Sequence, residues 1–194
     1  MTDNDLQTRG YLIKFSAKYL ADQLGSDRWT QLSAKFSPDL QRLLQSDIEH
    51  AGWYPIAQLS ELMRAIVTEL GDNDNERSKQ ALYECGRYVS SEAVSTFLKL
   101  FLKMLTPNIF AKKLPTLLRR DFTRGRATVE VEGKTIRCRE YDMHGFDHSA
   151  VCAAGFVATA LENLGKKVVG MKMTDWSVDQ PYVDGVMFEI TWQD

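Results

Sequence analysis

Apolar residues recur at helical spacing along the first part of the chain, up to about residue 120. The stretch RGYLIKFSAKYLADQLG places Leu12, Phe15 and Tyr19 on one side and ends at Gly25, a residue type that commonly follows a helix. The stretch IAQLSELMRAIVTELG shows the same spacing and ends at Gly71. Both stretches are therefore predicted to form amphipathic helices.

Further helices are expected between and after these two. Ser37 and Pro38 are residue types that cap and begin a helix, here at SPDLQRLLQ. A long helix is expected from about residue 75 to residue 105. Its second half, VSTFLKLFLKML, is apolar nearly all round, which is typical of a buried central helix. Pro107 ends that helix, and IFAKKLPTLLRRDF predicts another, interrupted or restarted around Pro115.

The spacing changes to strict alternation from Ala127 onward. ATVEVEG and TIRCREYDM both alternate, and the second run places Ile136, Cys138 and Glu140 on one face. HSAVCAAGFVATALENLG predicts a helix that ends at Gly165, and KVVGMKMTDWSV and GVMFEITW alternate again. The order strand, strand, helix, strand, strand predicts a four-stranded antiparallel sheet backed by helices. The predicted fold class is α+β, with an N-terminal helical part followed by this sheet and its one inserted helix.

The change of spacing also suggests how the chain is organised. We assign residues 1–72 to an N-terminal helical part and residues 73–194 to an α+β domain, and we expect one compact unit. A chain of 194 residues suits a single domain with an N-terminal extension. It is long enough to bury a large core without metal or disulfide bonds.

The composition narrows the class of protein without identifying a reaction. Apolar residues make up 44% of the chain and charged residues 26%, as in ordinary globular proteins. The three cysteines form no CxxC motif and fit a reducing compartment. The N-terminus lacks the regions of a signal peptide, and no apolar run approaches the ~20 residues that span a bilayer. We therefore expect a cytoplasmic protein without a membrane span.

The net charge of −2 hides a basic segment. Between Lys99 and Arg139 there are eleven Lys or Arg and three acids, which makes this segment +8 and the rest of the chain −10. We favour solvated helix and strand faces as the explanation. If the segment does bind an anionic ligand or an acidic partner, the candidates are the four arginines at the junction of the helical half and the first strand, Arg119, Arg120, Arg124 and Arg126.

At this point the residues show a family resemblance. The first half, from YLIKFSAKYL through GWYPIAQLSELMRAI, resembles a family of unknown function that is expanded as paralogues in myxobacteria. The second half, from LYECGRYVSSEAVSTFLK to GVMFEITW, is similar to a superfamily that includes 4-vinyl reductase domains, haem-nitric-oxide-binding domains and subunits of the TRAPP vesicle-tethering particle. The shared pattern is Gly86 in a long helix, a hairpin, a helix ending ENLGKK, and a closing hairpin. The resemblance implies a bacterial ligand-binding or protein-docking module rather than a defined reaction.

Haem binding in the manner of that superfamily is not expected here. The haem-nitric-oxide-binding family uses a proximal histidine on a helix before the sheet and a Tyr-x-Ser-x-Arg motif in the strand region. The interval from Ala51 to Met143 contains no histidine, and Tyr141 is followed by DMHG. Both parts are therefore absent, and we expect no cofactor.

The stretch DMHGFDHSAVC offers a metal site as an alternative. His144, His148 and Cys152 follow one another at four-residue spacing, which can place zinc ligands on one helical face. Gly145 disfavours a helix across the first pair, however, and Cys152 belongs to an apolar segment. We therefore favour a loop that runs into a buried helix with a core cysteine, and keep a metal- or haem-dependent sensor or enzyme as the alternative.

Sequence motifs of catalysis are missing, although one receptor pattern is partly matched. The chain has no GxSxG, Walker, HExxH or GxGxxG motif, which lowers the expectation of an enzyme. Cyclic dinucleotide receptors of the PilZ type use RxxxR followed by [D/N]xSxxG. Arg120 and Arg124 match the first part and Asp147 and Ser149 the second, but Cys152 stands where the glycine should be. This receptor role is kept as a weaker alternative.

These observations lead to a leading hypothesis for function. We expect a non-enzymatic sensory or signalling module that binds a small ligand, a protein partner, or both, and a homodimer is one form such a partner can take. Nucleic acid is not expected. The pocket is expected between the central helix and the sheet, around four aromatic residues that serve equally well as a solid core: Tyr83, Tyr88, Phe97 and Phe101.

Overall fold

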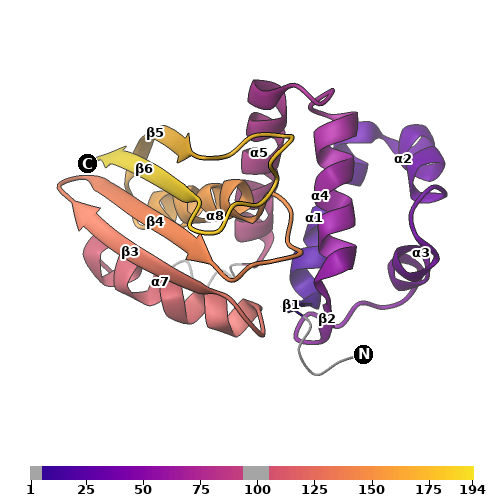
Figure 1. The fold of residues 1–194 in the computed structure, drawn as a ribbon, viewed down its shortest axis with the longest axis horizontal. Coiled ribbons are helices and arrows are strands. Elements are labelled where there is room, and N and C mark those ends of the chain that lie inside the picture. The colour runs from indigo at the N-terminus through magenta and orange to yellow at the C-terminus, as the bar shows by residue number, and fades with distance from the viewer. Residues whose placement is uncertain (1–5, 94–104) are drawn as a thin grey trace.

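The computed structural model describes residues 6–93 and 105–194 (Figure 1). The first part of the chain forms a helical layer with one short two-stranded sheet. Gly25 adopts a positive φ of 75° directly after the first helix, and the Ser37 side chain accepts a hydrogen bond from the Leu40 backbone N–H at the start of the third, as the sequence predicts. The elements of this part are β1 (Gln7–Arg9), α1 (Gly10–Leu24), α2 (Ser26–Ser33), α3 (Pro38–Gln45), β2 (Trp53–Pro55) and α4 (Ile56–Glu69).

Two helices connect this layer to the sheet. Helix α5 (Asn75–Ala93) covers the first part of the region expected to form a long helix, and Phe97 and Phe101 lie outside the described residues. Helix α7 (Pro107–Asp121) begins with Thr106 as its cap. The expected break at Pro115 is wrong, because α7 continues through that proline. Phe110, Ala111 and Leu114 are buried along one side of α7, and this packing offsets the hydrogen bond that proline cannot donate.

The predicted α+β class and strand order are confirmed. The four strands form one antiparallel sheet in the order β3-β4-β6-β5, and α8 (Ser149–Asn163) is inserted between β4 and β5. Helix α7 packs on β3, and α8 packs on β5 and β6 (Figure 1). Polar pairs such as Arg137 with Glu189, 2.8 Å apart, occupy the opposite face. The strands are β3 (Arg126–Glu132), β4 (Thr135–Tyr141), β5 (Lys167–Thr174) and β6 (Met187–Gln193).

Helices α5 and α8 cross in close contact at two glycines. A Cβ added at Gly86 would lie 2.0 Å from the Cys152 carbonyl oxygen, and one added at Gly155 would lie 2.0 Å from the Tyr83 carbonyl oxygen. Neither position can therefore hold a larger residue at this crossing distance. The two glycines therefore allow the short distance between α5 and α8.

Helix α5 also connects the two predicted parts of the chain. The proposed boundary after residue 72 falls in a turn where Asp72 and Asn73 have positive φ values. Beyond that turn, α5 packs on α1 and α4 on one side and on α8 on the other. That residues 1–72 and 73–194 fold as one unit stays a prediction.

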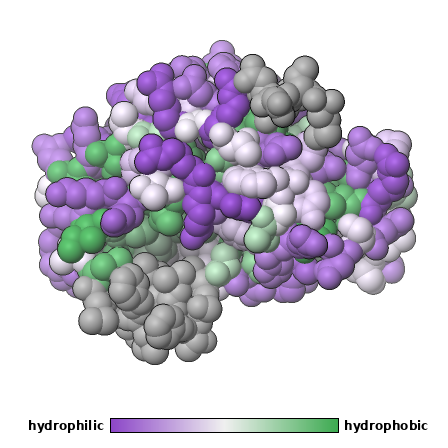
Figure 2. Space-filling model, turned by 90° about the horizontal axis from the view of Figure 1, so that it is seen from below, coloured by the Kyte–Doolittle hydropathy of each residue, from purple (hydrophilic) through white to green (hydrophobic). Residues whose placement is uncertain are grey.

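The surface is mainly hydrophilic in the view of Figure 2, and apolar residues gather toward the side where the sheet and α7 lie. Among the described residues, three large apolar side chains are exposed: Trp53, Ile109 and Val169. None of the described helices combines the length and the apolar composition needed to cross a membrane.

Candidate functional site

An apolar cavity of about 120 Å³ lies where the helical layer meets the sheet. Its walls come from α1, α4, α5, α7 and α8, from strands β3, β4 and β6, and from the loop after β4. Apolar side chains such as Leu114, Met143, Phe146 and Phe188 make up most of the lining. The cavity lies between the central helix and the sheet, where a pocket was expected, although Tyr83 and Tyr88 are not among its lining residues.

Glu140 is the unusual residue of this lining. Its side chain is only 2% exposed, and its Oε2 atom forms no hydrogen bond with the described residues. Ser149, at the start of α8, is also buried, and its Oγ atom is likewise without a hydrogen-bond partner there. Burial raises the pKa of Glu140 to about 7, and the nearby Ser149 hydroxyl only partly opposes this shift.

The sheet places Glu140 in the cavity. Strand β4 buries Ile136, Cys138 and Glu140 on the same face, as their alternation in the sequence indicates. The backbone of Glu140 is held on both sides, since its N–H donates to the Val186 carbonyl and its carbonyl accepts from the Gly185 N–H. Sequence reasoning did not single out Glu140, although an acid on an apolar strand face is a detectable signal.

Asp121, the second acid of the lining, has a partner. The guanidinium group of Arg120 reaches both of its carboxylate oxygens at 2.8 Å. Arg120 also donates to the Tyr11 hydroxyl at 3.3 Å. The hydrogen bonds to Asp121 raise the pKa of Arg120 further above its ordinary value. The charge of Asp121 is therefore balanced locally, while Glu140 has no such cation among the lining residues that the structure describes.

Three cysteine thiols also line the cavity. Burial raises the pKa of Cys85 to about 12 and shifts the pKa values of Cys138 and Cys152 in the same direction. Cys85 contacts the Ser16 hydroxyl at 3.7 Å, and Cys152 contacts the Met63 sulfur at 3.2 Å. In the absence of a metal, this burial favours protonated thiols that pack as small apolar groups.

Comparison with solved structures shows an H-NOX-like fold over nearly the full chain. An unliganded Fe(II) H-NOX protein from K. algicida superposes with a TM-score of 0.70 at 11% identity, covering 96% of this chain and 97% of the other. An H-NOX protein from S. oneidensis in the Fe(II)NO ligation state gives 0.66 at 13% identity, covering 96% and 99%. An oxygen-binding H-NOX domain related to soluble guanylate cyclases gives 0.58 at 12% identity, covering 96% and 95%. The superfamily resemblance of the second half is confirmed at the level of fold.

Sequence comparisons do not extend this result. No protein-family model matches the chain, and no curated protein matches it either. The resemblance of the first half to the myxobacterial family is therefore not confirmed.

The residues around the cavity do not fit haem. Its described lining contains no histidine, and the sequence has none between Ala51 and Met143. The charged groups of the described lining are the carboxyl groups of Asp121 and Glu140, whereas haem propionates would require cations. The volume of about 120 Å³ also lies below the ~300 Å³ at which pockets for drug-sized ligands begin.

The aromatic residues expected around the pocket have other surroundings where the structure describes them. Tyr83 lies under the guanidinium group of Arg87, 5.8 Å from it. The Tyr88 hydroxyl donates to Asp22 at 3.0 Å and also contacts Lys18. On helix α5 the cavity is lined instead by Cys85, Gly86 and Val89. Their role as ligand-pocket residues stays a prediction, and Phe97 and Phe101 lie outside the described residues.

The three predicted metal ligands have separate surroundings. His144 is exposed and packs edge-on against Tyr182. His148 is buried directly before α8 with a positive φ of 63°, and burial lowers its pKa to about 4. Cys152 lies on α8 and faces the cavity. The favoured interpretation, a loop that runs into a buried helix, agrees with this arrangement.

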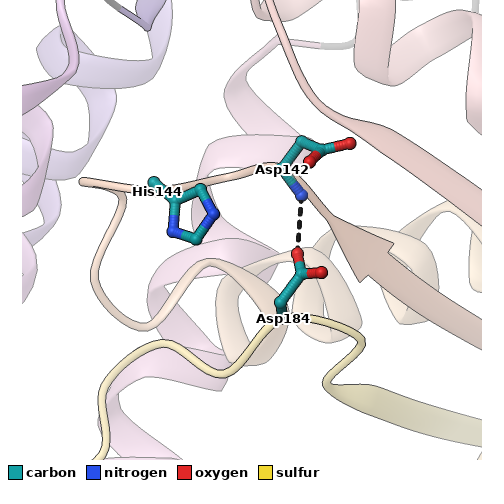
Figure 3. A group of neighbouring side chains, drawn as sticks. All are labelled: Asp142, His144 and Asp184. Atoms are coloured by element: carbon teal, nitrogen blue, oxygen red, sulfur yellow. Dashed lines mark hydrogen bonds between the residues drawn. The ribbon is translucent and has the colours of Figure 1, made fainter.

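His144 instead lies beside two aspartates, one at the end of β4 and one before β6 (Figure 3). Asp142, His144 and Asp184 are exposed, and one potential ligand atom from each lies within 4.8 Å of the others. The Asp142 carboxylate pairs with Arg126 at 2.7 Å. The Asp184 carboxylate accepts the Asp142 backbone N–H at 2.8 Å and the Tyr182 hydroxyl at 2.7 Å. Both carboxylates are therefore already engaged by groups of the protein itself.

The predicted anion-binding arginines are exposed at the end of α7 and the start of β3. Arg120 and Arg126 pair within the molecule, with Asp121 and Asp142 respectively. Arg119 and Arg124 are exposed as well. Their role in binding an anionic ligand or partner stays a prediction.

The second part of the cyclic dinucleotide pattern is already used by the fold. Asp147 pairs with Arg64 at 2.6 Å, and Ser149 is buried against the cavity. In the PilZ-type pattern these two residues would face a ligand together with the arginines. The surroundings of Asp147 and Ser149 do not favour this receptor role.

Proposed function

We propose that this protein is a non-enzymatic sensory module that binds a small apolar ligand, without haem, in the cavity between its helical layer and its sheet. The supporting observation is the cavity itself, because residues from both halves of the chain line it. The H-NOX-like fold agrees with a sensory role. The described lining of the cavity contains no histidine, which argues against sensing through haem iron.

The position of the cavity gives a ligand a route to signalling. A ligand placed there would contact Leu12 of α1, Leu59 of α4, Leu118 of α7 and Phe188 of β6 at once. A molecule that binds one arrangement of these elements more tightly than another shifts the equilibrium between them. The helical layer and the sheet would therefore respond together to occupancy of the cavity.

Native mass spectrometry of the gently purified full chain tests this function. We expect a mass above that of the bare chain, or a rise in Tm when a library of small apolar compounds is screened. An absorption spectrum without a Soret band and metal analysis without iron should accompany that result. A bare mass with no rise in Tm across the library would contradict the proposal, and stoichiometric haem would replace it with haem sensing.

A protein partner, including a second copy of the chain, stays a prediction. The arginines at the end of α7 are its candidate surface, and Arg120→Glu with Arg124→Glu is the corresponding variant. Binding of an acidic partner through this surface should weaken strongly in that variant and become less dependent on salt. A partner that binds the variant as tightly as the original protein would exclude this surface.

A further inference from the structure

We propose that Glu140 is the recognition group of the cavity, and that the ligand is an apolar molecule about one ring in size that carries a hydrogen-bond donor. This inference rests on the proposed function and specifies the ligand class. It follows from three properties of the cavity, which are its volume, its lining and the state of its acidic groups.

The volume limits the size of the ligand. A cavity of about 120 Å³ is close to the ~150 Å³ of an engineered apolar cavity that binds benzene. Phe146, Phe156, Val157 and Phe188 contribute to the lining, and these side chains have no polar atoms. A ligand body that matches this space is one ring or a short branched chain without charge on its apolar side.

Glu140 determines what polar group the ligand carries. Its Oε2 atom is buried and has no hydrogen-bond partner among the described residues. Leaving such an atom unpaired destabilises a protein, so an unpaired buried carboxyl group in a native fold calls for an explanation. The Ser149 hydroxyl acts on the carboxyl group of Glu140 but is itself without a hydrogen-bond partner among the described residues. A ligand hydroxyl or amine would supply the donor that Oε2 lacks and a partner for Ser149. Either protonation state of Glu140 can accept this donor, because the acid keeps a carbonyl oxygen.

The charges of the described lining disfavour an anionic ligand. Asp121 is the other charged group of the lining, and Arg120 already holds both of its oxygens. An anionic ligand would therefore meet two acids and no available cation among the described lining residues. The described lining therefore favours neutral or cationic donors.

Four single-ring probes test this inference on the full chain. Toluene has no donor, phenol has a neutral donor, benzylamine has a cationic donor, and benzoate is an anion of similar size. The affinity of each probe is measured by NMR titration for the original protein and for Glu140→Met, which removes the acceptor and keeps the length of the side chain. Glu130→Met, at an exposed acid on β3, is the matched control.

We expect phenol or benzylamine to bind at least about tenfold more tightly than toluene, as one buried hydrogen bond provides. Benzoate should bind least. In Glu140→Met the donor probes should bind about as tightly as toluene, whereas Glu130→Met should retain the difference in affinity. A higher affinity for benzylamine than for phenol would indicate that the ligand pairs with the carboxylate form of Glu140. A higher affinity for phenol would indicate a hydrogen bond without an ion pair.

The outcomes separate this inference from the function on which it rests. Equal binding of toluene and phenol, or a donor preference that survives in Glu140→Met, would overturn the role of Glu140 and leave the cavity as a binding site. Failure of all four probes to bind would overturn the inference and count against a small-ligand function as well. Glu140→Met is expected to fold, since it removes a buried unpaired carboxyl group, and circular dichroism checks this.

Discussion

The cavity and the exposed Asp142–His144–Asp184 cluster both include residues at the end of β4 and differ in how their polar groups are satisfied. The cluster contains the residue types that bind metals, yet its carboxylates are engaged by Arg126, by Tyr182 and by a backbone N–H. The cavity contains few polar groups, yet Glu140 is buried without a hydrogen-bond partner for one of its oxygens.

The difference shows that unmet bonding capacity is a better guide to a binding site than residue type. In water, an exposed carboxylate loses little when it has no ligand, because solvent or a neighbouring cation satisfies it. In an apolar cavity solvent is excluded, and here the Ser149 hydroxyl does not satisfy Oε2 of Glu140, so the free energy of this group falls when a suitable ligand arrives. The buried Glu140 is therefore the better candidate, although His144 and its neighbours look more like a site in the sequence.

The largest expected effect comes from adding a side-chain atom where α5 and α8 cross. Gly155→Ala places a Cβ 2.0 Å from the Tyr83 carbonyl oxygen, so the helices must separate and the cavity wall must move. We expect the free energy of unfolding to fall by about 3 kcal/mol or more, measured by urea denaturation. The cluster in the loop should be unaffected.

Gly170→Ala on β5 is the control for that change. A Cβ at this position would have the Thr191 Cβ at 4.0 Å as its nearest neighbour, which is ordinary contact. The stability of this variant should change by less than ~1 kcal/mol. Equal losses in the two variants would show that the α5–α8 crossing is not the sensitive feature.

The next effect concerns the ionisation of Glu140. Its pKa is raised from 4.5 to about 7 in the folded protein. Between these pH values the folded protein holds a proton that the unfolded chain has lost. The stability that Glu140 contributes is therefore complete below pH 4.5 and is lost as pH rises through 7. The full loss is about 3 kcal/mol.

The free energy of unfolding of Glu140→Met, minus that of the original protein, should therefore rise by about 2 to 3 kcal/mol between pH 4.5 and pH 8. His148 shifts in the opposite direction, since its pKa is lowered to about 4, but both proteins contain it and its contribution cancels. Urea denaturation at both pH values measures the difference. A difference independent of pH would mean that Glu140 ionises normally in the fold and would weaken the contrast with the exposed cluster.

A smaller effect is expected at the satisfied acid of the cavity. Arg120→Met removes the guanidinium group that pairs with Asp121 and leaves a carboxylate with only 10% of its side chain exposed. We expect a loss of about 1 to 2 kcal/mol, moderated because the Arg120 side chain is half exposed. Arg119→Met, at an exposed position on the same helix, should change stability by less than ~0.5 kcal/mol. Similar values for the two variants would show that Asp121 does not depend on Arg120.

The smallest effect is expected in the exposed cluster. Asp184→Asn keeps an oxygen that can accept hydrogen bonds, so stability should change by less than ~0.5 kcal/mol in thermal denaturation. Zinc added to the original protein should not raise Tm, because the carboxylates of Asp142 and Asp184 are already engaged. A rise in Tm that saturates at one zinc per chain and is absent in Asp184→Asn would show that the cluster is a metal site. The exposed cluster would then be the better binding-site candidate.

Local signals in the sequence predicted much of this fold, because they act over a few residues. The change from helical spacing to alternation near Ala127 predicted β3 and β4, and Ser37 with Pro38 predicted the start of α3. Other elements depend on distant partners. Strand β1 forms by pairing with the distant strand β2, for example between Gln7 and Pro55. A short local sequence carries little information on such pairing.

The candidate site shows the same division between local and distant information. The sequence by itself determined that Glu140 shares a strand face with Ile136 and Cys138, because side chains alternate along any strand. Only the tertiary structure decided that this face closes a cavity, that Asp121 has Arg120 while an oxygen of Glu140 has no partner, and that Tyr83 and Tyr88 have other neighbours. The physical reason is that pairing and burial depend on which elements pack together, and here the crossing of α5 and α8 at Gly86 and Gly155 sets that packing.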